Sequence, residues 1–286
     1  MLEALKRTDT SLASGPMVAW QLLHAYPTVN LLHAGAAAAI ELNRPESLNA
    51  WNEQLGVDLR AAVERVAGEE DIRAVLIRGA GRAFSSGADL REVLNPVAAQ
   101  RPEVYRILTE RYNPIIAGVR RMPKPVVAAV HGPAVGIGCS LALACDLVIA
   151  AEAAYFLLAF VNIGLAPDGG ACAFLAARVG GARAAELAML GERLPAAMAL
   201  QWGLINKVVS DAECTAESEA LVERLAQGPT RSYASTKRQL NSWLYLGLDD
   251  QLELEARLQR EVAATNDFAD GVAAYLEKRQ ARFQGS

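Results

Sequence analysis

Short apolar runs alternate with helical patterns through the middle of the chain. The runs are rich in Ala, Val and Ile, and two of them end directly at an Asn or a Gly that breaks an extended strand. They cover Ala37–Leu42, Ala74–Arg78, Val126–Val130 and Leu147–Ala150. Because strand, turn and helix repeat in this order, we expect an α/β domain.

Helical periodicity fills the segments between these runs. Asn52 can cap a helix with one apolar face, and a second helical stretch covers about Val104–Arg121. The apolar face of the first helix holds Leu55, Leu59, Ala62, Val63 and Val66.

The segment after about Ser210 is charged and amphipathic, which indicates surface helices. Its apolar positions form one face with Leu254, Leu258 and Val262 and another with Val272, Tyr275 and Leu276. We therefore expect three parts: an N-terminal extension (residues 1–25), an α/β core (residues 26–210) and a C-terminal helical region (residues 211–286).

One segment, Pro125–Cys145, contains no Asp, Glu, Lys or Arg. By length alone it could cross a membrane. His131-Gly132-Pro133 and two further glycines interrupt it, however, and such residues break a continuous helix. We interpret the segment as a buried strand, a turn and a buried helix, with no membrane insertion.

Composition excludes several other classes of protein. Of the 286 residues 52% are hydrophobic, too many for a disordered chain. The net charge of −4 and the absence of a long basic run argue against nucleic-acid binding. The four cysteines and three histidines show no metal-ligand spacing, so we expect no metal site. No apolar segment follows Lys6 and Arg7, so we expect no signal peptide and a cytoplasmic setting.

Two glycine-rich turns carry the candidate chemistry. Residues 84–90 follow the strand that ends at Arg78, and residues 131–138 follow the strand that ends at Val130. A strand-to-helix turn exposes backbone N–H groups at the positive end of a helix dipole, where an anion or a polarised carbonyl oxygen can bind. The alternative is a tight turn that needs glycine for its backbone angles. Neither turn matches a P-loop or a complete dinucleotide-binding fingerprint.

In their order along the chain, these motifs resemble the crotonase (enoyl-CoA hydratase/isomerase) superfamily. The similarity spans roughly residues 29–283 and is carried by Asn43-Arg44-Pro45, Leu48-Asn49-Ala50, Phe84-Ser85-Ser86-Gly87-Ala88-Asp89-Leu90, His131-Gly132, Gly136-Ile137-Gly138-Cys139, Cys145-Asp146, Gly164-Leu165-Ala166-Pro167-Asp168-Gly169-Gly170 and Trp202-Gly203-Leu204-Ile205. The resemblance implies a spiral of βαβ units with C-terminal helices that build a homotrimer or hexamer. It also implies an acyl-CoA thioester as ligand, with no cofactor beyond the coenzyme A of the substrate.

The resemblance assigns roles to individual residues. The backbone N–H groups of Ala88 and Ile137 would form an oxyanion hole for the thioester oxygen, and such donors stabilise an enolate by several kcal/mol. Lys278, or its neighbour Arg279, would pair with the phosphates of coenzyme A. The full set of substrate-contacting and CoA-contacting residues is Ser47, Leu48, Ser86, Asp89, Leu90, Gly136, Ser140, Phe160 and Lys278.

Carboxylates distinguish the reactions within the superfamily. Its hydratases carry one glutamate where this chain has Ser140 and another where it has Ala159-Phe160. Asp168 remains as the candidate base, and phenylacetate-pathway enoyl-CoA isomerases share both the Ala-Phe pair and the Pro-Asp run. One carboxylate suffices to shift a double bond, and we expect the apolar Phe160 to exclude water and to raise the pKa of Asp168.

Three functions follow from this comparison. The first is a Δ3–Δ2 enoyl-CoA isomerase, whose substrates could include ring-derived CoA thioesters. The second is hydration or another crotonase reaction that uses an acid not yet recognised. The third is a catalytically silent acyl-CoA-binding protein, and the presence of Asp168 argues against it.

Overall fold

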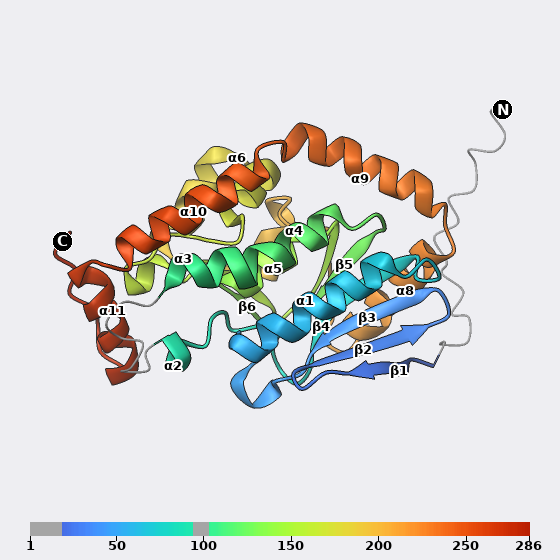
Figure 1. The fold of residues 1–286 in the computed structure, drawn as a ribbon, viewed down its shortest axis with the longest axis horizontal. Helices are drawn as coiled ribbons and strands as arrows, with labels where there is room; N and C mark the ends of the chain where they lie inside the picture. Colours follow the sequence, from blue (N-terminus) through green and yellow to red (C-terminus); the bar gives the residue numbers. More distant parts are fainter. Residues whose placement is uncertain (1–18, 94–102) are drawn as a thin grey trace.

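A computed structural model describes residues 19–93 and 103–286 of the chain. A seven-stranded sheet forms its centre, in the order β1-β2-β3-β4-β5-β7-β10, and a second, three-stranded sheet has the order β6-β8-β9. Strands β1 to β5 of the larger sheet are labelled in Figure 1. The strands are β1 Gln21–Ala25, β2 Val29–Ala34, β3 Ala37–Leu42, β4 Ala74–Gly79, β5 Val126–Val130, β6 Pro133–Val135, β7 Leu147–Ala151, β8 Tyr155–Leu157, β9 Leu194–Pro195 and β10 Lys207–Val209.

Helices cover the sheet and form most of the C-terminal region (Figure 1). The α-helices are α1 Glu53–Gly68, α2 Leu90–Val93, α3 Val104–Ile107, α4 Asn113–Arg121, α5 Ile137–Ala144, α6 Ala171–Leu190, α7 Ala196–Gln201, α8 Cys214–Ala226, α9 Thr230–Leu244, α10 Leu248–Val262 and α11 Asn266–Glu277. Further helical turns are the 3₁₀ turns η2 Pro45–Ser47 and η4 Val161–Ile163 and the π-helical turn η3 Leu108–Tyr112. The α/β fold class expected from the sequence is confirmed.

The central strands β3, β4, β5, β7 and β10 run parallel, whereas β1 and β2 pair antiparallel. Alternate side chains of a strand point to opposite faces. One face, with Ile40 and Ile77, packs in the main core with α1, α4 and α5. The other face, with Leu76 and Val127, packs against α8. The C-terminal region is therefore continuous with the core.

The predicted N-cap of α1 is present. The side chain of Asn52 accepts a hydrogen bond from the backbone N–H of Leu55 at 2.8 Å, which satisfies one of the free donors at the start of the helix. The predicted apolar face, including Leu59 and Val63, is buried against the sheet. Local sequence signals therefore determine both the start and the orientation of this helix.

The uncharged segment Pro125–Cys145 forms β5, β6 and α5, as its interruptions predicted. Every residue of α5 is buried, so its apolar composition reflects a central position in the core. Within residues 19–93 and 103–286, no helix is long and apolar enough to cross a membrane.

Residues 21–25 differ from the expectation of an N-terminal extension that ends at residue 25. They form β1, an edge strand that pairs with β2 from Gln21 opposite His33 to Ala25 opposite Asn30. The strand is short and mostly exposed, so it lacks the apolar run that identified the central strands. Residues 1–18 of the expected extension lie outside the described residues.

Helix α10 forms where the amphipathic pattern predicted a helix. Leu254 and Leu258, which share one apolar face, are 42% and 40% exposed. The side facing the protein carries Leu252, Ala256 and two polar residues, Glu255 and Gln259.

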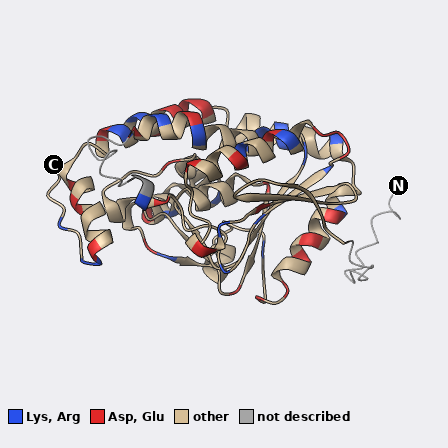
Figure 2. Ribbon diagram, turned by 60° about the horizontal axis from the view of Figure 1, so that its bottom comes forward, with Lys and Arg blue, Asp and Glu red and all other residues tan. Residues whose placement is uncertain are grey.

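Acidic and basic residues both occur on the surface helices (Figure 2). Helix α10 carries both signs along its length, whereas α9 carries Arg231, Lys237 and Arg238 and no acidic residue. The two long C-terminal helices therefore differ in charge: α10 is mixed and α9 is basic.

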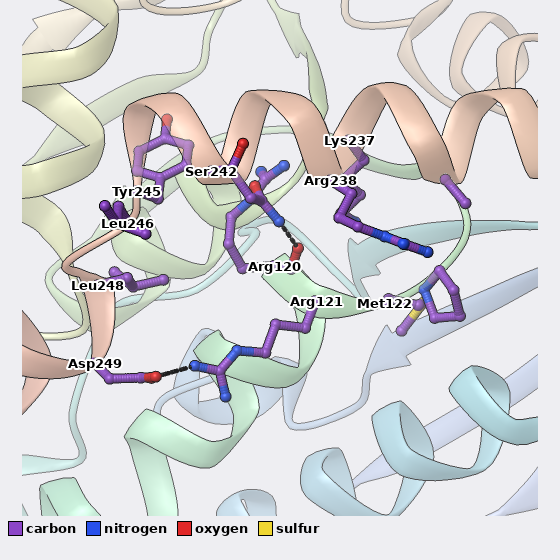
Figure 3. A pocket seen from close by; sticks show the side chains of 13 residues that line it. Arg120, Arg121, Met122, Lys237, Arg238, Ser242, Tyr245, Leu246, Leu248 and Asp249 are labelled. Carbon is purple, nitrogen blue, oxygen red and sulfur yellow. Dashed lines mark hydrogen bonds and ion pairs between the residues drawn. The ribbon is translucent and has the colours of Figure 1, made fainter.

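Asp146, at the end of the buried helix, ties the C-terminal region to the core. Its carboxylate accepts hydrogen bonds from Arg120 of α4 at 2.5 Å and from Lys237 of α9 at 2.8 Å. The side chains of Arg120 and Lys237 are only 5% and 6% exposed. Asn241 links α9 to Arg120 through two further hydrogen bonds. Arg120 and Lys237 line a pocket between these helices (Figure 3). This network has a structural role.

Asp146→Ala is expected to lower the free energy of unfolding by about 3 kcal/mol or more, because it leaves two buried cations without their partner. Chemical denaturation measures the change. Asp249→Ala is the matched control, since Asp249 pairs with Arg121 at the exposed rim of the same pocket (Figure 3). The control should change stability by less than about 1 kcal/mol. Equal effects of the two variants would contradict the assignment.

Candidate active site

The two glycine-rich turns meet at one edge of the sheet. The strands β4 and β5 are adjacent and parallel, so the turns that follow them leave the sheet on the same side. The backbone N–H of Ser85 donates to the carbonyl of Pro133 at 3.0 Å, and the N–H of Val135 donates to the carbonyl of Ser85 at 2.9 Å. The topology therefore brings together two motifs that lie about fifty residues apart in the sequence.

The first of these turns directs the N–H of Ala88 away from its neighbouring strand. Ala88 forms a parallel bridge with Trp51, in which the carbonyl of Gly87 accepts from Trp51 at 2.8 Å and the N–H of Asp89 donates back at 3.0 Å. Successive N–H groups of an extended chain point in opposite directions. The N–H of Ala88 consequently points away from Trp51.

The second turn presents the N–H of Ile137 at the start of α5. The preceding Gly136 has φ +52° and ψ −127°, a combination accessible to glycine and strained for other residues. Ile137 is the first residue of the helix, so no helical carbonyl is available to its N–H. The N–H group lies at the positive end of the helix dipole and is suited to a polarised oxygen.

Asp168 lies in the loop between η4 and α6, beside this second turn. A Cβ atom added to the next residue, Gly169, would lie 2.5 Å from Cδ1 of Ile137 and 3.0 Å from Cβ of Ser140. Only glycine permits this close approach. The hydroxyl of Ser140 donates to the backbone carbonyl of Asp168 at 2.8 Å. The loop is thus held against the start of α5, and Asp168 is only 6% exposed.

A second buried carboxyl group, Glu255 of α10, belongs to the same cluster. Burial and then the charge of Glu255 raise the pKa of Asp168 to about 8, against a hydrogen bond from Gln259 that lowers it. Burial raises the pKa of Glu255 to about 7, against hydrogen bonds from Gln251 and from the N–H of Gly170. The pKa of Asp168 therefore moves in the expected direction, and Glu255 is an additional cause.

Sequence reasoning did not identify Glu255 and Gln259 as members of this cluster. They lie almost ninety residues after Asp168, and no local motif links the two segments. One signal was present: both share a helical face with Leu248, Leu252 and Ala256. Polar residues on the buried face of a helix need a hydrogen-bonding partner, and a charged one points to a functional or structural cluster.

Several residues assigned to CoA binding gather around the first turn. The N–H of Ser86 donates to the carbonyl of Leu48 at 2.9 Å, and its hydroxyl donates to the carbonyl of Ser47 at 3.2 Å. Leu90 begins α2 directly after the turn. The carboxylate of Asp89 accepts from the guanidinium of Arg44 at 3.2 Å, so this side chain supports the loop that holds Ser47 and Leu48. The structure brings these five predicted residues together.

Three other predicted contacts have different surroundings. The ring of Phe160 lies beside Gly136, where a Cβ on the glycine would be 3.7 Å from its Cζ. Ser140 is fully buried and its hydroxyl is used by Asp168, so the structure gives it a positioning contact instead of the expected substrate contact. Lys278 caps the end of α11 and is exposed, with no ion pair among the described residues. Arg279 pairs with Asp270 and Glu277.

Comparison with known proteins decides the family. The family model described as enoyl-CoA hydratase/isomerase matches residues 33–286. The chain belongs to the enoyl-CoA hydratase/isomerase family. The resemblance to the crotonase superfamily inferred from the motifs is therefore confirmed, and the chain is an enzyme of that superfamily.

Individual members of the enoyl-CoA hydratase/isomerase family are similar over nearly the whole chain. A probable enoyl-CoA hydratase of Rhodobacter capsulatus is 41% identical over 261 residues, covering 91% of this chain and 99% of that protein. The 1,2-epoxyphenylacetyl-CoA isomerase of Escherichia coli K12 is 39% identical over 246 residues, covering 86% of this chain and 94% of that protein. The crystal structure of an enoyl-CoA hydratase from Mycobacterium avium subsp. paratuberculosis K-10 superimposes with a TM-score of 0.82 at 38% identity, covering 91% and 100%.

Proposed function

We propose that this enzyme is an enoyl-CoA isomerase that moves a double bond between the 3- and 2-positions of an acyl-CoA thioester. The observation that carries the proposal is the environment of Asp168. Its carboxyl group is buried beside the start of α5, and its Oδ1 atom accepts no hydrogen bond from the described residues. Ser140 and Phe160 occupy the positions where the hydratase pattern has glutamates, so Asp168 is the candidate base.

A single carboxylate completes this reaction. Asp168 removes a proton from C2 of a 3-enoyl thioester, and the electron pair of that C–H bond forms a C1–C2 double bond while the thioester oxygen becomes negative. The dienolate then collapses: the oxygen returns its electrons, the C2–C3 double bond forms, and C4 takes the proton back from Asp168. No atom is gained or lost, so neither water nor a redox partner is needed.

The backbone donors supply the electrostatic part of the mechanism. The N–H groups of Ala88 and Ile137 would bind the thioester oxygen as its negative charge develops, and they need no reorganisation because two turns already hold them. The raised pKa of Asp168, about 8, suits a base that must accept a proton and return it near neutral pH. Phe160 contributes an apolar wall beside Gly136 that limits the access of water.

Acyl-CoA thioesters, including ring-derived ones, are the proposed substrates. The support is the family itself, together with the similarity to the E. coli 1,2-epoxyphenylacetyl-CoA isomerase. Ser47, Leu48, Ser86 and Leu90 surround the first turn and are the proposed contacts to the CoA portion. Lys278, exposed at the end of α11, is the proposed partner of a CoA phosphate.

Hydration is the second candidate, and Glu255 is the observation that favours it. Hydration uses two carboxylates, and the structure places a second one beside Asp168. Similarity to the R. capsulatus probable enoyl-CoA hydratase supports the same reaction. Against it, Glu255 already accepts hydrogen bonds at both oxygens, from Gln251 and from Gly170, which leaves its carboxylate in a supporting position.

Product analysis tests the proposed function. The purified enzyme is incubated separately with a 3-enoyl-CoA and with the matching 2-enoyl-CoA, and the products are separated by liquid chromatography with mass detection. Isomers without 3-hydroxyacyl-CoA are the expected result. A 3-hydroxyacyl-CoA formed at a comparable rate would favour hydration, and binding without any turnover would favour a silent acyl-CoA-binding protein.

We also propose that the enzyme assembles as a homotrimer or hexamer through its C-terminal helices. Trp243 at the end of α9 and Leu246 just after it are 86% and 84% exposed, and Leu254 and Leu258 expose a further apolar stripe on α10. Light scattering at micromolar concentration should give three or six times the mass of one chain. A monomer under these conditions would contradict the assembly.

A further inference from the structure

The buried face of α10 carries an unusual set of polar side chains. Gln251, Glu255 and Gln259 follow one another at four-residue spacing, which places them in a row along the helix. Glu255 is 4% exposed and Gln259 is fully buried. Burying such groups costs free energy unless they are hydrogen-bonded. Their hydrogen-bond partners therefore indicate the role of these three residues.

Gln259 and Glu255 contact the loop of Asp168 directly, and Gln251 supports Glu255. The side-chain amide of Gln259 donates to Oδ2 of Asp168 at 3.0 Å. The backbone N–H of Gly170, two residues further along, donates to Oε2 of Glu255 at 2.8 Å. Gln251 donates to the other oxygen of Glu255 at 2.9 Å. Helix α10 thus holds both the carboxyl group of Asp168 and the loop that carries it.

These contacts make the two oxygens of Asp168 unequal. Oδ2 is fixed by Gln259, whereas Oδ1 accepts no hydrogen bond from the described residues. The hydroxyl of Ser140 donates to the backbone carbonyl of Asp168 and holds its main chain. Rotation of the carboxyl group would break the Gln259 hydrogen bond in a buried environment, so Oδ1 is kept as the oxygen free to exchange a proton.

We propose that Gln259 and Glu255 are positioning residues for the base: Gln259 determines which carboxyl oxygen of Asp168 exchanges the proton, and Glu255 fixes the loop and supplies a negative charge beside it. This inference rests on the proposed isomerase function. It assigns roles to two residues of the C-terminal helical region, whose sequence suggested only a packing or assembly role.

The two residues act on the base in opposite electrostatic directions. The hydrogen bond from Gln259 stabilises the charged form of Asp168 and lowers its pKa, whereas the negative charge of Glu255 raises that pKa. Among the described residues, Glu255 is the charged group coupled to Asp168. The thiol of Cys172 on α6 is coupled to Glu255 in turn, and its pKa of about 11 keeps it neutral near pH 7.

Gln259→Met tests the orienting hydrogen bond. Methionine has a similar length, cannot donate, and also removes the Oε1 atom of Gln259, which is buried without a partner, so the fold should be retained. We expect kcat to fall by about 10- to 100-fold with KM nearly unchanged. The acid limb of the pH profile of kcat/KM should move to higher pH, because the carboxylate loses a donor.

Glu255→Gln tests the neighbouring charge. Glutamine keeps an oxygen that can accept from Gly170, so the loop remains held while the charge is lost. The acid limb should move to lower pH by roughly one unit, opposite in direction to Gln259→Met. Glu261→Gln, the same change at an exposed position of α10, is the matched control and should leave the profile unchanged. If the two residues had a purely structural role, the acid limb of the pH profile would shift in the same direction in both variants or in neither. That result would overturn the inference.

A titration without substrate separates this inference from the proposed function. The protonated carboxyl group of Asp168 is followed by infrared difference spectroscopy against Asp168→Asn, in wild type and in both variants. The titration midpoint of Asp168 should move to higher pH in Gln259→Met and to lower pH in Glu255→Gln. If they occur in an enzyme that isomerises no enoyl-CoA, the isomerase proposal fails while the electrostatic coupling stands. If isomerisation occurs and neither variant shifts the midpoint, the positioning roles are wrong.

Discussion

Asp168→Asn is expected to lower isomerase turnover by about 10³- to 10⁴-fold while acyl-CoA binding is retained. Asparagine has the shape of aspartate and its oxygen can still accept the hydrogen bond from Gln259, so the site keeps its geometry. It cannot accept a proton near neutral pH, and the neighbouring carboxyl group of Glu255 is held by Gln251 and Gly170. Steady-state kinetics gives kcat, and isothermal titration with a saturated acyl-CoA gives the binding constant.

The stability of the same variant is the control for its folding. Burial raises the pKa of Asp168 from 3.8 to about 8, so the folded state binds this proton more tightly than the unfolded state does. This carboxyl group therefore makes the protein less stable as the pH rises from about 4 to about 8. Asparagine removes that cost, and the variant should melt at the same or a higher temperature than wild type at pH 8 and above. A large loss of stability there, or full activity, would remove Asp168 from the mechanism.

Gly136→Ala is expected to lower kcat by about 10²- to 10³-fold, the usual effect of losing one oxyanion-hole donor. The positive φ of Gly136 places the next N–H, that of Ile137, at the start of α5. An alanine Cβ would have space, since its nearest contact is the Phe160 ring at 3.7 Å. The loss therefore comes from the backbone, which must leave the strained conformation and carry the Ile137 N–H with it.

Gly35→Ala is the matched control for this backbone effect. Gly35 lies in the turn between β2 and β3, has a φ of +57°, and a Cβ there would meet no atom within 4 Å. The substitution should cost about 1 kcal/mol or more of stability through the same kind of strain, with kcat unchanged. If Gly136→Ala and Gly35→Ala reduce stability alike and neither changes kcat, the N–H of Ile137 does not bind the thioester oxygen.

Much of the fold follows from local patterns. The runs Ala37–Leu42 and Val126–Val130 form strands with the expected bounds, because burial on both faces of a parallel sheet demands continuous apolar residues. Asn52 caps α1, as its position before an amphipathic segment predicted. The edge strand β1 has no such demand, and its mixed, exposed sequence gave no signal. Burial therefore explains both results: the buried strands β3 and β5 could be predicted from the sequence, and the exposed strand β1 could not.

The candidate site has parts that the sequence could predict and parts that it could not. The turns that hold Ala88 and Ile137, and the Pro-Asp-Gly-Gly run of Asp168, are local and could be located from the sequence. The partnership of Asp168 with Glu255 and Gln259 is not local, because it depends on how α10 packs against a distant loop. Leu254 and Leu258 lie on an exposed part of α10, and assembly with other chains is the proposed use of that apolar stripe.

The central claim is that one buried carboxyl group both removes and returns the proton. Its most direct test uses a 3-enoyl-CoA deuterated at C2, converted by the wild-type enzyme in ordinary water, with the product analysed by mass spectrometry and NMR. Because Asp168 is shielded from solvent, a substantial share of the deuterium should reappear at C4 of the 2-enoyl-CoA. Complete replacement of the label by solvent hydrogen in the first turnover would contradict the account.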